Sequence, residues 1–249
     1  MAYQPGVTQQ PGVPNAPGAQ VYMPMPEPIP GVPAGLEYLS QIDQLIVKQT
    51  VELFEMFTEI ETNNKYKVKN SMGQDVYNAV EKSDFCSRQC CGPNRGFEIH
   101  IKDAASRAVI VAERPFVCTV LPCFSSCRFS MTVKSPMTNE VLGYIKQNFY
   151  CCHPNFSVLD ANETEIFKVD GPCIQCGCSD KVFEIQDLNG TKCGAVTKKW
   201  SGILKEAYTD ADNFNVSFPI DLDVKLKATL LALVFMIDFM FYEQPANNN

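Results

Sequence analysis

The chain has 249 residues, of which 45% are hydrophobic, and it carries a net charge of −7, so it is long enough for one or two domains with a sizeable core. The acidic balance argues against nucleic acid as a partner and against purely electrostatic adhesion to anionic lipid, because both need a basic surface. The N-terminus lacks the basic start and apolar core of a secretory signal, so a reducing compartment is expected. The twelve cysteines are then buried thiols, metal ligands or acylation sites rather than a disulfide framework.

Residues 1–34 form a proline-rich segment with nine of the seventeen prolines and one charged residue, Glu27. Such a segment cannot bury enough apolar surface to fold and is expected to be disordered or in polyproline II conformation. Its PxxP spacings fit SH3 or WW domains, and a plain flexible linker is the alternative because these spacings arise by chance in so proline-rich a stretch. The prolines concerned are Pro11, Pro14, Pro17, Pro30 and Pro33.

From residue 35 onward the pattern is mainly β. Apolar residues alternate in short runs, and period-two alternation is typical of half-buried strands. The runs are Tyr66/Val68, Phe97/Ile99/Ile101, Phe129/Met131/Val133, Phe167/Val169 and Phe214/Val216/Phe218. Turn sequences separate them at about ten-residue spacing, as in a sandwich or a barrel. These turns are SMGQD, DAASR, SPMTNE, DANETE and DLNGTK.

Residues Ala228–Tyr242 form an apolar segment that only Thr229 and Asp238 interrupt. As a helix it covers roughly 22 Å, short of the roughly 30 Å of a bilayer's hydrocarbon core. A helix that is apolar on every side must be buried on every side, so we predict that it fills a closed β-barrel. A membrane-spanning helix is the alternative, with Lys225 and Lys227 flanking its start. The other helical candidate is 36–44. The residues predicted to pack in the barrel or the membrane are Ala228, Leu231, Val234, Phe235, Ile237, Phe239 and Phe241.

A central group of cysteines lies in FVCTVLPCFSSCRF, a proline-containing stretch flanked by apolar residues. Cys118, Cys123 and Cys127 in such a loop suit S-palmitoylation, and ordinary buried thiols in strands are the alternative. Cys173 and Cys176 have the spacing of a zinc knuckle, but no second clean pair completes a four-ligand site. For the central group, the residues alone favour acylation and buried thiols equally.

An acidic segment precedes the apolar helix. Counting Asp210 as position one of a calcium loop puts Asp212 at position three and Asp221 at position twelve, and hard oxygen ligands at such positions suit Ca²⁺. Phe214 at position five and Asn215 at position six fit poorly, so a site here should be weak. Because NFNVSFP alternates like a strand, the alternative is that the acidic residues only flank a strand.

No nucleophile elbow, P-loop or dinucleotide glycine motif appears in the sequence, so no classical enzyme is predicted.

Several long blocks between Gly35 and Glu243 are distinctive. They include GLEYLSQIDQ, ETNNKYKVKNSMGQDVYNAVE, CCGPNRGF, ERPFVC, GPCIQC, KKWSGILKEAYTDADNFNVSFPIDLDVKLKA and IDFMFYE. In order and almost without gaps, these blocks resemble the phospholipid scramblase family.

The resemblance implies a tubby-like fold, a twelve-stranded antiparallel barrel around a central C-terminal helix. We therefore expect a disordered segment at 1–34, a scramblase domain at 35–243 and a disordered tail at 244–249. The family's palmitoylated run aligns with 121–127, where this chain keeps Cys123 and Cys127. Its nuclear-import segment aligns with 194–203, where only two residues are basic. Its calcium segment aligns with Asp210, Asp212, Asn213, Phe214, Val216, Phe218 and Asp221.

Two functions follow from the resemblance. The first is calcium-dependent, ATP-independent movement of phospholipids between leaflets, for which Ca²⁺ is the expected cofactor. A single short apolar helix provides no hydrophilic path for a headgroup, so assembly into a homo-oligomer or bilayer thinning would have to supply one. The second is an acyl-anchored adaptor that binds lipid and protein on the cytosolic leaflet. Both place the chain on the cytosolic face of the plasma membrane, with a nuclear pool as a lesser expectation.

Overall fold

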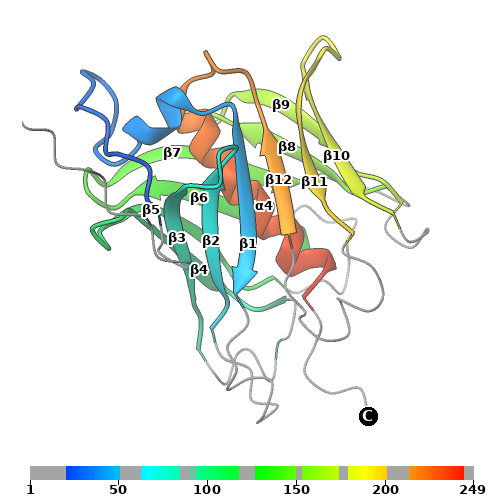
Figure 1. Ribbon diagram of the computed structural model, residues 1–249. Coiled ribbons are helices and arrows are strands. Elements are labelled where there is room, and N and C mark those ends of the chain that lie inside the picture. The colour runs from blue at the N-terminus through cyan, green and yellow to red at the C-terminus, as the bar shows by residue number, and fades with distance from the viewer. Residues whose placement is uncertain are drawn as a thin grey trace, which may run out of the picture.

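The computed structural model describes residues 21–50, 63–84, 91, 94–117, 127–149, 153–173, 179–200 and 213–243. Within these residues, twelve antiparallel strands close into a barrel around one long helix, as Figure 1 shows. The predicted barrel is thereby confirmed. The strands are β1 (Gln44–Thr50), β2 (Lys65–Asn70), β3 (Asp75–Lys82), β4 (Phe97–Lys102), β5 (Ala108–Arg114), β6 (Ser130–Ser135), β7 (Glu140–Gln147), β8 (Asn155–Leu159), β9 (Glu165–Asp170), β10 (Lys181–Asp187), β11 (Lys192–Lys198) and β12 (Asn213–Ser217).

Each strand pairs with its neighbours in the sequence, and β12 pairs with β1 to close the barrel, with Gln44 opposite Ser217 and Lys48 opposite Asn213. Closure removes the free sheet edges at which β proteins associate. We name the two ends of the barrel by their connections. At the turn end, even-numbered strands lead into odd-numbered ones through the five predicted turn sequences, or from β12 into the helix. At the loop end, odd-numbered strands finish and even-numbered strands begin.

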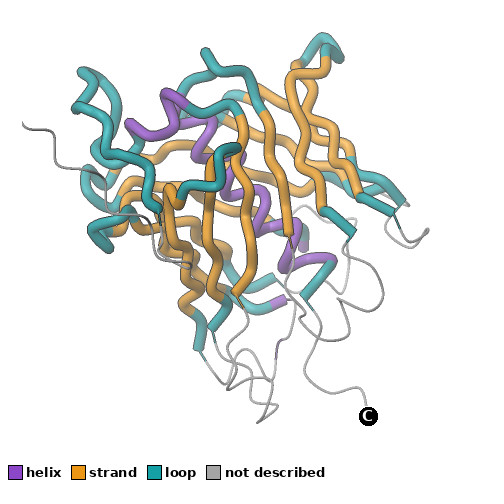
Figure 2. Tube along the Cα trace, in the orientation of Figure 1, coloured by secondary structure: helices purple, strands orange, loops and turns teal. Residues whose placement is uncertain are grey.

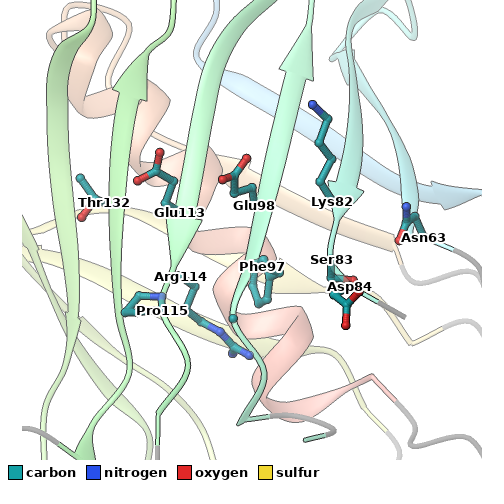
Figure 3. A pocket seen from close by; sticks show the side chains of 11 residues that line it. Asn63, Lys82, Ser83, Asp84, Phe97, Glu98, Glu113, Arg114, Pro115 and Thr132 are labelled. Atoms are coloured by element: carbon teal, nitrogen blue, oxygen red, sulfur yellow. The ribbon is translucent and has the colours of Figure 1, made fainter. Parts of the chain in front are cut away.

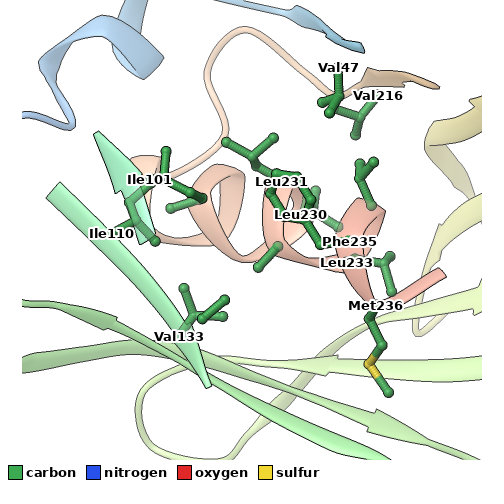
Figure 4. Packing of buried hydrophobic residues seen from close by; sticks show 14 of the residues in the cluster. Val47, Ile101, Ile110, Val133, Val216, Leu230, Leu231, Leu233, Phe235 and Met236 are labelled. Carbon is green, nitrogen blue, oxygen red and sulfur yellow. The ribbon is translucent and has the colours of Figure 1, made fainter. Parts of the chain in front are cut away.

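The helix α4 (Val224–Phe241) enters the barrel at the turn end and runs through it to the loop end (Figures 1 and 2). Every residue from Ala228 to Ile237 is 0% exposed. In Figure 4, the apolar side chains of α4 lie between those of opposite walls of the barrel. The prediction that the helix fills the barrel is confirmed. No helix among the described residues combines the length and apolar character needed to cross a membrane.

The helix begins one turn earlier than predicted because Asp223 caps it, accepting a hydrogen bond from the Lys225 backbone N–H at 2.8 Å. Lys227, predicted to flank the helix, is instead fully buried within it. Its ammonium donates to the carbonyl oxygens of Leu39, Ile42 and Ile220 at 2.9, 2.8 and 2.7 Å. A buried lysine is tolerated here because its three protons are bonded, and it ties the start of the helix to the segments before β1 and after β12.

The chain before β1 is more ordered than predicted. Residues 21–34 were expected to be disordered, yet the backbone of Met23 donates to Asp75 and that of Asp75 donates to Val21, each at 2.9 Å. Pro30 is exposed and Pro33 is buried, whereas Pro11, Pro14 and Pro17 lie outside the described residues. The helix expected at 36–44 is only the 3-10 helix η1 (Glu37–Gln41), because the chain enters β1 at residue 44.

Candidate functional site

A groove of about 800 Å³ crosses the outer wall of the barrel at the loop end, over the ends of β3, β4 and β5. Four of its side chains stand in one row, because Lys82 lies opposite Glu98, Glu98 opposite Glu113, and Glu113 opposite Thr132 on adjacent strands. Figure 3 shows this row along the wall, with Phe97 and Arg114 beneath it. Strand alternation therefore places charged groups in the groove and seals its floor with core residues.

The row combines one cation with two anions. Carboxylates directly opposite each other on neighbouring strands repel, and each is offset by its own partner. His100 Nε2 lies 2.7 Å from Glu98, and Lys134 Nζ lies 2.6 Å from Glu113. The exposed ammonium of Lys82 lies beside them. A small group that carries both charges could meet complementary hydrogen-bonding groups along this wall.

The floor of the groove is a buried guanidinium. Arg114 is 2% exposed and its Cζ lies 4.3 Å from the ring centroid of Phe97 and 4.6 Å from that of Phe129. Its Nη2 donates to the Arg95 carbonyl oxygen at 2.8 Å. Burial, followed by the neighbouring charge of Arg95, lowers the pKa of Arg114 to about 9, so it remains a cation at neutral pH.

An ionic cluster next to the groove closes the loop end of the barrel. Arg95 lies 2.9 Å from Glu81 and donates to Glu243 at 2.7 Å, and Asn64 donates to both carboxylates. Burial acts to lower the pKa of Arg95, but the hydrogen bonds from Arg95 to Glu243 and Glu81, together with their negative charges, raise this pKa above its ordinary value. The cluster therefore fastens the residues that follow α4 to the beginnings of β2 and β4.

Asp238 is the acidic residue inside the helix, and it is buried against β2. The hydroxyl of Tyr66 donates to it at 2.6 Å, and the Tyr66 ring packs against Phe235 with centroids 5.0 Å apart. Burial, and then the charge of Asp238, raise the pKa of Tyr66 well above its usual value. Burial likewise raises the pKa of Tyr77, whose hydroxyl bonds the Gly35 carbonyl.

We expect the free energy of unfolding to fall as the pH rises above 10. A tyrosine whose folded pKa is raised contributes stability that is complete below its unfolded pKa of 10.0 and is lost as the pH climbs toward the folded value. One pH unit above the unfolded pKa, each such tyrosine costs about 1.4 kcal/mol. Urea denaturation at mildly and strongly alkaline pH measures this loss. The Tyr66→Phe variant should lose less free energy of unfolding than wild type between these pH values, by the contribution of one tyrosine. An unchanged loss would contradict the raised pKa of Tyr66.

Of the residues predicted to bind calcium, the structure describes those from Asn213 to Asp221. Residues Asn213–Ser217 form β12, with Phe214, Val216 and Phe218 buried in the barrel, so the strand alternative is the observed conformation. Asp221 is exposed and follows β12 at the turn end. Asp210 and Asp212 lie outside the described residues, but they precede the opposite end of the strand. The described residues contain no group of three or more His, Cys, Asp or Glu side chains arranged around a metal position.

The predicted acylation sites belong to the loop end. Cys127 is a half-buried free thiol just before β6, whereas Cys118 and Cys123 lie outside the described residues. The connections at this end contain eleven of the twelve cysteines, and Cys193 in β11 is the twelfth. The barrel topology therefore brings the ends of four cysteine-containing connections to one side of the molecule.

Sequence reasoning missed the groove and the ionic cluster. Glu81 and Arg95 are 14 residues apart and Arg95 and Glu243 are 148 apart, so no local pattern joins them. Arg95 stands two residues before the alternating run of β4, and an arginine near a buried run was the one available signal. It predicts a buried partner without identifying it.

Comparison with known proteins gives a consistent result. The family model described as Scramblase matches residues 23–244. Phospholipid scramblase 1 of Mus musculus is 47% identical over 236 residues, which cover 94% of this chain and 71% of the mouse protein. Phospholipid scramblase 2 of Bos taurus is 44% identical over 234 residues, covering 93% of this chain and 79% of the bovine protein. Phospholipid scramblase family member 5 of Homo sapiens is 39% identical over 230 residues, covering 90% of this chain and 84% of the human protein. No solved structure matches significantly.

Proposed function

Because the chain belongs to the phospholipid scramblase family, we propose that it moves phospholipids between the two leaflets of a membrane, in a Ca²⁺-dependent and ATP-independent manner. The observation that carries the proposal is the extent of the similarity, which covers nearly the whole barrel and its central helix. No covalent chemistry is required, so the protein acts as a lipid translocator and not as a classical enzyme.

The barrel interior is not the route for a headgroup. Moving a polar headgroup through hydrocarbon is costly unless polar groups accompany it. The barrel is filled, since α4 is 0% exposed from Ala228 to Ile237 and packs against the surrounding walls. We therefore propose that headgroups contact the outer wall, where Lys82 could meet a phosphate while Glu98 and Glu113 meet an amine. Protein assembly or local thinning of the bilayer would complete the path.

Reconstitution tests the proposed function. Full-length protein in liposomes that carry a leaflet-specific lipid probe should speed equilibration of the probe when Ca²⁺ is added without ATP. Rates equal to those of protein-free liposomes at millimolar Ca²⁺ would contradict it. A Lys82→Ala variant should slow transport of lipids with a phosphate headgroup, while Lys192→Ala, an exposed lysine at the turn end, serves as the matched control.

The filled barrel favours a second candidate function. A barrel with no lumen can bind lipid and protein without transporting either, as an adaptor held by acyl chains on the cytosolic leaflet of the plasma membrane. In this alternative the proline-rich segment recruits SH3 or WW domains. Liposome binding without accelerated lipid exchange would select the adaptor.

Calcium binding should be weak and should depend on the acidic residues before β12. Ligands of one Ca²⁺ lie within a few ångströms of each other, whereas β12 separates its two ends by roughly 13 Å. Asp212→Ala should therefore weaken binding more than Asp221→Ala, because Asp221 follows the far end of the strand. Calorimetric titration of wild type and both variants measures this, with an expected Kd on the order of 10⁻⁴–10⁻³ M. Equal losses in the two variants would show that both residues reach one ion.

Stable membrane attachment should require acyl chains on Cys118, Cys123 and Cys127, because a net charge of −7 provides little electrostatic attraction. Two chains hold a protein far better than one, so replacing all three cysteines with serine should shift most of the protein out of the membrane fraction of cells. Cys193→Ser, on β11, is the control. An unchanged membrane fraction in the triple variant would assign anchoring to another element.

A further inference from the structure

We propose that the barrel docks onto a phospholipid bilayer by its loop end, with Phe116, Phe149 and Trp200 as the side chains that enter the interface. The inference rests on the proposed function, since that function supplies phospholipid as the partner. It adds the orientation of the molecule on the membrane and the residues that set it.

The exposed aromatic residues are confined to one end of the barrel. Among the described residues, the large aromatic side chains that are exposed are Phe116 at 58%, Phe149 at 63% and Trp200 at 43%. Each follows the last residue of an odd-numbered strand by two positions, after β5, β7 and β11, so all three lie at the loop end (Figure 1). Aromatic side chains are the ones that favour the boundary between headgroups and hydrocarbon.

Hydrogen bonds hold the backbone at or beside each of these residues. The Trp200 backbone N–H donates to Asp180 at 2.9 Å. Next to Phe116, the Val117 N–H donates to Asn94 at 3.1 Å, and before Phe149 the Asn148 N–H donates to Asn155 at 2.8 Å. The backbones that carry the aromatic rings are therefore fixed before a membrane is met, which lowers the ordering cost of binding.

Three lysines lie on the strand ends next to Trp200. Lys181 and Lys198 are directly opposite each other on β10 and β11, and Lys199 is next to Trp200. Lys198 Nζ lies 3.8 Å from the ring centroid of Tyr242, and Lys199 lies 2.7 Å from Asp180. Lysines on the strand ends next to an exposed indole suit the phosphates of lipid headgroups.

Among the described residues, the turn end carries no exposed large aromatic side chain. Its exposed apolar residues are aliphatic, with Met72 at 75% and Leu188 at 55%. Carboxylates hold the turns here, as Asp187 accepts from the Asn189 and Thr191 backbones and Asp160 accepts from Asn162 and Thr164. Because aromatic side chains are the ones that favour the membrane interface, the turn end is the side expected to face away from the bilayer.

The test uses the fluorescence of Trp200, which is the single tryptophan of the chain. Full-length protein produced in cells that acylate its cysteines is mixed with vesicles of phosphatidylcholine and phosphatidylserine in a ratio of about four to one, a composition that mimics an anionic leaflet. The emission should shift to the blue, and lipids brominated on their acyl chains should quench it. Vesicle flotation without a change in emission would overturn the proposal, as would the absence of flotation.

Variants provide a second readout. Phe116→Ser with Phe149→Ser should lower vesicle partitioning by about tenfold or more, because two exposed aromatic contacts with lipid are lost. Met72→Ser with Leu188→Ser removes exposed apolar groups from the turn end and should leave partitioning unchanged. Equal partitioning of the two double variants would overturn the proposal. Because the replaced side chains are exposed, thermal melts should match wild type and report any loss of folding.

Failure of the docking proposal and failure of the proposed function are distinguishable. Fluorescence and flotation require no lipid transport, so docking through the loop end without accelerated lipid exchange would support the inference and contradict scrambling. Accelerated lipid exchange by a protein whose Trp200 stays in water would support scrambling and contradict docking through the loop end.

Discussion

Deletion of the chain from Ala228 onward is expected to abolish cooperative folding. The helix α4 fills the barrel, and its removal takes away the partners of inward-facing rings, as in the stacking of Phe97 on Phe239 at 4.1 Å between centroids. Loss of one large buried side chain costs roughly 3–5 kcal/mol, and several such losses exceed the roughly 5–15 kcal/mol that stabilise a typical domain. Circular dichroism melts and size-exclusion chromatography measure the outcome.

The matched control for this truncation is deletion of residues 244–249 only, which leaves the helix and Glu243 in place. That chain should melt cooperatively and elute as wild type does. If the longer truncation also stayed soluble, monomeric and cooperatively folded, the helix would not be the core, and a membrane-spanning role for it would regain support.

Arg95→Ala is expected to lower the free energy of unfolding by about 3–5 kcal/mol, because removing one partner leaves a buried charge uncompensated. Glu81 is 0% exposed and lies 2.9 Å from the guanidinium. Arg95 also donates a hydrogen bond to Glu243, and the Cζ atom of Arg95 lies 5.0 Å from the ring centroid of Phe239. The substitution therefore loosens the end of α4 together with the start of β4. Urea denaturation followed by circular dichroism gives the value.

Two further variants show whether the loss comes from burial. Lys192→Ala breaks a surface pair with Glu184 in which both side chains are about half exposed, and it should cost less than about 1 kcal/mol. Arg95→Met combined with Glu81→Gln removes both charges and should recover part of the loss, because no unpaired buried carboxylate remains. An Arg95→Ala effect as small as that of Lys192→Ala would contradict the assigned role.

Sequence periodicity predicted the strands that have one face toward the helix and one toward solvent. Strand β4 is the clearest case, with Phe97, Ile99 and Ile101 buried and the residues between them more exposed. Periodicity is lost at the start of β3, where Asp75–Tyr77 are all buried, and in β5, where four consecutive residues from Val109 are buried. Residues 21–41 account for this, because Gly35 lies against Val109 and its carbonyl accepts from Tyr77. A strand covered on both faces no longer alternates.

The site was less predictable than the fold because its contacts are distant in sequence. The ammonium of Lys227 bonds a carbonyl 188 residues away, and no spacing rule connects such positions. In the acidic segment, two local patterns competed. The calcium-loop count used Asp212 and Asp221, whereas the alternation of Phe214 and Val216 predicted a strand, and the strand formed because both side chains complete the core. Burial of these two apolar residues fixes the conformation of Asn213–Ser217, and calcium binding by the acidic residues stays a prediction.

We infer that the protein acts on membranes as a barrel whose helix stays inside. Hydrogen exchange of the full-length protein, free and bound to liposomes under conditions that give lipid exchange, tests it most directly. We predict that the amides of α4 and of β4 to β6 stay equally protected in both states, since the helix and these strands share one core. Protection retained in α4 but lost from β4 to β6 on liposomes would show that the helix leaves the barrel for the bilayer, and it would contradict the claim.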